Sequence, residues 1–99
     1  MVLNVNTAAV GASAATEAGI GTETSAAMAA AAEVLTGVMP MGADLDSVQF
    51  AAAVNAIGAA YIGTVMEHVA DRELFAEAQD LAAATYTATE VVNDTALSL

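Results

Sequence analysis

The chain has no cysteine, no lysine and no tryptophan, and Arg72 is its single strongly basic residue. Without cysteine there can be no disulfide, thiolate nucleophile or zinc–thiolate site. Phosphate contacts are built from Lys and Arg, so their near absence excludes nucleic-acid binding. Attraction to anionic lipid headgroups is disfavoured for the same reason, since the formal net charge is −11.

Aromatic residues are also scarce, at 4%, although 58% of the residues are hydrophobic. Alanine is the largest part of that apolar fraction. It is the best helix former because it loses no side-chain entropy in a helix, but it buries little area. The chain should therefore form helices more easily than a core. A domain of this length is marginal on its own, so we expect another chain to complete it.

Pro40 is the only proline, and Gly37 and Gly42 lie on either side of it. Such a group breaks a helix. We therefore expect an all-α fold, an elongated antiparallel two-helix hairpin that completes a helical bundle with a partner chain. The predicted single domain covers residues 1–99, with a helix at about 7–36, a hinge at about 37–45, a helix at about 47–84 and a flexible tail at about 85–99.

The predicted second helix begins with Asp46 as N-cap and Gln49 completing a capping box. Its large apolar residues follow helical spacing in two neighbouring lobes, which is wider than one adjacent helix requires. We expect one lobe to pack on the first helix and the other on a partner. The predicted partner interface consists of Phe50, Val54, Ile57, Tyr61, Ile62, Val65, Val69 and Phe75.

No catalytic group can be assembled from the sequence. His68 shares its stripe with no serine or second histidine, and Asp71 and Arg72 are its expected partners one turn onward. The acidic residues of the second helix are expected to be a solvated face and not a metal site. We therefore predict that the chain is not an enzyme and holds neither metal nor cofactor.

The hinge reads Val38-Met39-Pro40-Met41-Gly42-Ala43-Asp44 and is followed by Val48-Gln49-Phe50-Ala51-Ala52. It resembles the VVPxxADxVS-like turn and alanine-rich helix of the PE family of mycobacterial proteins. Tyr86 and Glu90 resemble the Tyr-x-x-x-Asp/Glu secretion signal of that family. The resemblance covers essentially the whole chain, as in a PE domain without a C-terminal extension. It departs from the family at Ala8-Ala9, where members carry the Pro-Glu pair.

The resemblance implies a secreted or cell-surface protein that pairs with a PPE-family partner. Export would use an ESX (type VII) secretion system, without a conventional signal peptide, and an EspG-type chaperone would contact the PPE subunit. Two alternatives stay open. One is a self-associating hairpin that forms a homodimeric four-helix bundle. The other is a membrane-inserting or pore-contributing protein that uses residues 50–66, a run at the lower length limit for a membrane span that we expect instead to be buried.

Overall fold

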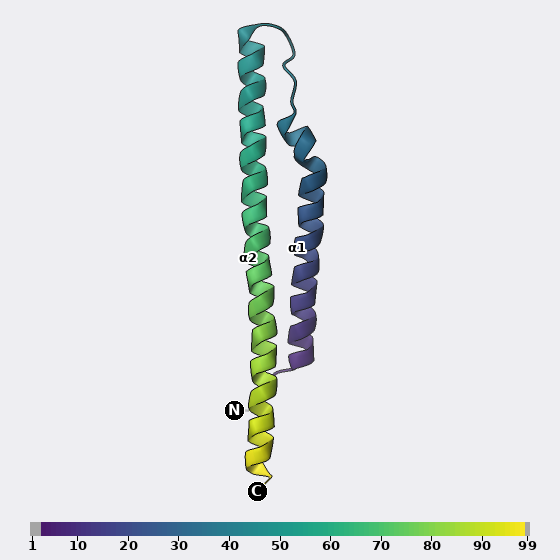
Figure 1. Ribbon diagram of the computed structural model, residues 1–99, viewed down its shortest axis with the longest axis vertical. Helices are drawn as coiled ribbons and strands as arrows, with labels where there is room; N and C mark the ends of the chain where they lie inside the picture. The colour runs from purple at the N-terminus through teal and green to yellow at the C-terminus, as the bar shows by residue number, and fades with distance from the viewer. Residues whose placement is uncertain (1–2, 99) are drawn as a thin grey trace. The chain divides into compact units, whose positions relative to one another are not determined.

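The computed structural model describes residues 3–98, and these residues form two helices, α1 (Thr7–Thr36) and α2 (Leu45–Leu97) (Figure 1). The described residues contain no strand. The prediction of an all-α fold made of two helices is thus confirmed. Residues 37–44 connect the helices and contain Pro40, which cannot continue a helix.

Asn6 begins α1 as its N-cap. Its Oδ1 accepts a hydrogen bond of 3.0 Å from the backbone N–H of Ala9, and its carbonyl accepts one of 3.1 Å from Val10 N–H. Such a cap satisfies one of the donors that every helix leaves free at its start. This explains how α1 begins with Ala8-Ala9 in its first turn, where the PE resemblance would place Pro-Glu.

The N-cap of α2 is Asp44, and the prediction of Asp46 was wrong. Asp44 Oδ1 accepts a hydrogen bond of 2.9 Å from Ser47 N–H, and its Oδ2 accepts one of 2.8 Å from the Ser47 hydroxyl. These two bonds hold the pKa of the Asp44 carboxyl below its ordinary value of 3.8, because they stabilise the carboxylate form. Asp46 lies inside the first turn of the helix, where its charge still favours the helix dipole.

The far end of α2 also differs from expectation, because the helix continues to Leu97 where a flexible tail was predicted after about residue 84. Its threonine hydroxyls donate to the backbone carbonyl four residues earlier, which satisfies these polar groups within the helix. Thr85, Thr87, Thr89 and Thr95 all make this bond, at 2.8–2.9 Å. No proline or glycine interrupts the helix after Gly63, and β-branched residues cost only tenths of a kcal/mol each.

The packing divides the chain into two compact units, each formed by one stretch of α1 and one stretch of α2. Unit 1 contains the described parts of Met1–Gly21 and Asp71–Leu99, and unit 2 is Thr22–Ala70. Both helices pass without a break from one unit to the other. The single domain predicted from the length stays a prediction.

Candidate functional site

Unit 2 packs its two helices along a seam that mixes small residues with larger apolar ones. On α2 the seam positions are buried or half-buried and alternate at spacings of four and three, as in a heptad pattern; they are Ala51, Asn55, Gly58, Ile62, Val65 and Val69. On α1 the same spacing gives the half-buried residues Thr24, Met28, Ala31 and Leu35. A period of 3.5 residues is typical of helices that stay in contact over many turns.

Gly58 allows the closest approach in this seam. A Cβ atom added at residue 58 would lie 1.9 Å from the backbone oxygen of Leu35, far inside any possible contact. The two backbones therefore meet here because residue 58 has no side chain. By contrast, a Cβ added at Gly63 would meet nothing within 4 Å.

Asn55 fixes the connection that follows α1. Its Oδ1 accepts a hydrogen bond of 2.8 Å from Val38 N–H, and its Nδ2 donates one of 3.0 Å to the Val38 carbonyl. Both backbone groups of Val38 are therefore satisfied after the helix has ended. This role could not be predicted from the sequence, where Asn55 is one of two polar residues in an apolar run.

The two flanks of the α2 seam differ sharply in side-chain size between Ala51 and Ile62. The residues one position before each seam residue of this stretch are bulky: Phe50, Val54, Ile57 and Tyr61 precede Ala51, Asn55, Gly58 and Ile62. The residues one position after these same seam residues are Ala52, Ala56, Ala59 and Gly63. Phe50, Ile57 and Tyr61 are 62%, 69% and 53% exposed, and Val54 is half-buried. We call these four bulky residues the bulky flank.

Val34 of α1 extends the bulky flank to the other helix. It immediately precedes the seam residue Leu35 and is exposed. Two packed antiparallel helices are related by a two-fold axis that is perpendicular to the plane containing both helices. A residue that precedes a seam residue on one helix therefore lies on the same side of this plane as a residue that precedes a seam residue on the other helix. Val34 and the bulky flank thus form one exposed apolar surface on unit 2.

The structure separates the eight predicted interface residues into two groups. Ile62, Val65 and Val69 lie on the seam, and Val69 is already 95% covered within the chain, being 5% exposed. Phe50, Val54, Ile57 and Tyr61 form the bulky flank. Phe75, in unit 1, likewise precedes a buried residue, Ala76, and is exposed.

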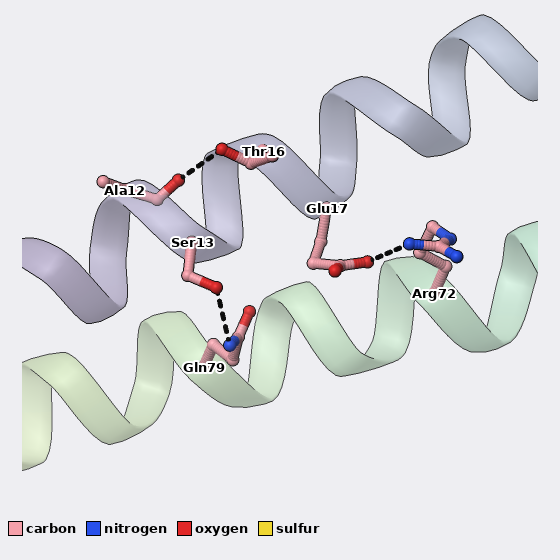
Figure 2. Close-up of polar contacts among 6 residues, drawn as sticks. All are labelled: Ala12, Ser13, Thr16, Glu17, Arg72 and Gln79. Carbon is pink, nitrogen blue, oxygen red and sulfur yellow. Dashed lines mark hydrogen bonds and ion pairs between the residues drawn. The ribbon is translucent and has the colours of Figure 1, made fainter.

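Polar side chains hold the helices together in unit 1. Arg72, the chain's one arginine, pairs with Glu17 of α1, and Gln79 Nε2 donates a hydrogen bond of 3.0 Å to Ser13 Oγ (Figure 2). The expected partner of Arg72 was His68, so Glu17 and Ser13 were missed. Both α1 residues lie in an alanine-rich stretch, and only the packing of the two helices reveals their partners.

Tyr86 and Glu90, the residues that resemble a secretion signal, lie four apart on α2 in unit 1. They line a cleft of about 270 Å³ together with Leu3, Asn4 and Val5, the residues that precede the Asn6 cap. Tyr86 is 39% exposed and Glu90 is exposed. The two side chains thus share one accessible site with the start of the described chain.

Two further properties of the described residues bear on function. α2 is long and apolar enough to cross a membrane by length and composition, and only 11% of its most apolar window is buried. Among residues 3–98, no group of three or more His, Cys, Asp and Glu side chains could hold a metal ion.

No curated protein and no solved structure matches this chain. The model of the PE family does match it, over residues 3–93 of 99. The match covers the Asn6 cap, both flanks of the seam and the Tyr86–Glu90 pair. The chain therefore belongs to the PE family.

Proposed function

We propose that this chain is a non-enzymatic protein that pairs with a PPE-family partner and is exported with it by a type VII (ESX) secretion system. Membership in the PE family supports, in general terms, a protein partner and a secreted or surface location. One observation carries the pairing: two of the three fully buried α2 seam residues, Ala51 and Gly58, are small, whereas most of the bulky apolar side chains beside them are exposed. An EspG-type chaperone would reach the pair through the PPE subunit.

The bulky flank, with Val34, is the proposed partner surface of unit 2, and Phe75 is its proposed contact in unit 1. Large apolar side chains at the centre of an interface carry most of its binding energy. The flank also has no charge, because Phe50, Val54, Ile57 and Tyr61 are all uncharged. Uncharged apolar centres are typical of stable protein interfaces.

The test is co-expression with candidate PPE-family proteins, followed by size-exclusion chromatography. Ile57→Asp should abolish the complex, because it buries an unpaired carboxylate in the interface. Ala59→Asp is the matched control. It adds the same group in the same helical turn, but on the side of the seam formed by Ala52, Ala56, Ala59 and Gly63, and it should leave the complex intact. If both variants co-purify with the partner equally, the surface is assigned wrongly.

The same experiment addresses the alternatives. A stable homodimer of the chain expressed alone, with a Kd that Ile57→Asp weakens, would favour the four-helix bundle of two copies. Partition of the chain into liposomes without a partner would favour membrane insertion. Membrane insertion is tested because only a small share of the most apolar window of α2 is buried.

Tyr86 and Glu90 are the proposed export signal. Residues four apart share a helix face, so the ring and the carboxylate can be read together. Tyr86→Ala and Glu90→Ala should each leave an intact complex inside the cell and none in the culture filtrate. Normal secretion of both variants, at unchanged intracellular level, would contradict the assignment.

A further inference from the structure

The cleft beside Tyr86 has a wall that the two-residue signal does not include. Residues 3–5 precede the helix, and their side chains complete the cleft opposite Tyr86 and Glu90. Val5 is half-buried and Leu3 is 76% exposed, so the segment offers an apolar wall that stays open to solvent. The Asn6 cap anchors this wall, because it fixes where the segment meets α1.

The lining of the cleft combines three kinds of group. Leu3 and Val5 are aliphatic, Tyr86 supplies an aromatic ring, and Glu90 supplies a carboxylate. The volume of about 270 Å³ lies below the range of pockets that hold drug-sized molecules, and it suits a single side chain. An aliphatic stem that ends in a cation would satisfy all three kinds of lining group.

The chain itself cannot supply that cation from a lysine or arginine. It has one such residue in total, and that residue, Arg72, is paired with Glu17. Glu90 therefore has no arginine or lysine of its own chain to neutralise it, in a protein of net charge −11. A cation supplied by another molecule would complement the charge of Glu90, which is exposed in the cleft.

We propose that this cleft binds an arginine side chain presented by the protein that reads the export signal, with residues 3–5 as part of the binding site. Arginine fits better than lysine because its planar guanidinium can pair with a carboxylate through two bonds and stack on an aromatic ring. Its methylene stem would lie along Leu3 and Val5. Only the identity of the protein that supplies the arginine rests on the proposed export role of Tyr86 and Glu90.

The experiment titrates the isotopically labelled full chain, in its complex, with N-acetylarginine amide and follows the NMR amide shifts. The uncharged analogue N-acetylcitrulline amide is titrated in parallel. We expect shifts confined to residues 3–5 and 86–90 with arginine, and several-fold weaker binding of citrulline. Glu90→Gln should weaken arginine binding roughly fivefold, the upper range for an exposed ion pair. Leu3→Ser should weaken both probes.

Asp94→Asn is the matched control, because it removes the same charge one turn further along α2 and does not line the cleft. It should leave arginine binding unchanged. The inference is overturned if Glu90→Gln binds the probe as well as the parent, or if Asp94→Asn weakens it as much. Pairing and export of the same variants are measured separately. Probe binding by a complex that is not exported would contradict only the proposed export role, and export of a complex that does not bind the probe would contradict only this inference.

Discussion

At the scale of single residues, the closest contact between the two helices of the seam depends on a residue without a side chain. Gly58 is the residue where the α2 backbone meets the Leu35 carbonyl, and no larger residue fits between them. Glycine costs about 1 kcal/mol relative to alanine in a helix interior. The close approach offsets that cost at residue 58, whereas nothing near Gly63 does so.

This contrast gives a paired prediction. Gly58→Ala should destabilise the folded complex by about 1–3 kcal/mol, because the new methyl group forces the two backbones apart. Gly63→Ala should stabilise it by up to about 1 kcal/mol through helix propensity alone. Thermal unfolding followed by circular dichroism measures both. A lower melting temperature for Gly63→Ala than for Gly58→Ala would contradict the seam.

Residue identity alone predicted part of the site. The helical spacing of Phe50, Ile57 and Tyr61 is visible in the sequence because these are large side chains among alanines. The seam is not visible, because Ala51 and Gly58 do not stand out from the alanines and glycines of either flank. Ile62, Val65 and Val69 are visible for the same reason as Phe50, and size alone does not separate a residue of the seam from one of the bulky flank. They were therefore grouped with the partner interface, and the structure places them at buried or half-buried seam positions.

At the scale of elements, the two helix starts show that a cap is decided by geometry as well as by residue type. Asp44 and Asp46 are both good N-caps by composition. Asp44 is followed three residues later by Ser47, whose N–H and hydroxyl both bind its carboxylate. The helix therefore begins one residue after Asp44, and the sequence placed its start two residues late.

The Asp44 cap predicts a pH dependence at the start of α2. The pKa of this carboxyl is lowered in the folded chain, first by the Ser47 N–H and then by the Ser47 hydroxyl. A group with a lowered folded pKa binds more protons when unfolded, so its stabilising effect is present above the unfolded value. That effect should fade as the pH falls below about 3.8 and through the lower folded pKa.

Asp44→Asn isolates this contribution, because asparagine can still accept a hydrogen bond from the Ser47 N–H but has no carboxyl to titrate. As the pH falls below about 3.8, the amides of Ser47 and Val48 should lose protection from hydrogen exchange relative to the rest of α2, after correction for intrinsic exchange rates, in the parent chain and not in the variant. Equal acid sensitivity of the two proteins at these amides would contradict the cap assignment. Asp46→Asn is the control, since its carboxylate makes no such pair of bonds with Ser47.

The C-terminal part of α2 is a second element that differs from the prediction, because it is helical where a flexible tail was expected. Its threonines and valines lower helix propensity only slightly, and the side-chain bonds of Thr85, Thr87 and Thr89 keep their hydroxyls satisfied within the helix. Weak propensity was therefore poor evidence for a tail. A continuous helix places Tyr86 and Glu90 one turn apart on a fixed face, which a flexible tail would not do.

At the scale of the whole molecule, the amounts of buried and exposed apolar surface are mismatched. The buried apolar residues of the described chain are Ala14, Ala51, Val69 and Ala76, and no large side chain among them is fully buried. Exposed apolar residues include Phe50, Ile57 and Phe75. A chain that buries mainly alanine gains little hydrophobic free energy, while ordering each residue costs about 1.5 kcal/mol.

The isolated chain should therefore be helical without unfolding cooperatively. Helicity persists because alanine favours it, but the free energy of the seam alone should not support an all-or-none transition. Circular dichroism of the chain alone should show helix that melts gradually, whereas the proposed complex with a PPE-family partner should give one sharp transition. Ile57→Asp, which we expect not to pair, should keep the gradual melt even when the proposed partner is present. A sharp two-state transition for the isolated monomer, confirmed as monomeric by mass measurement at the same concentration, would show that the seam suffices and that the bulky flank is not needed for folding.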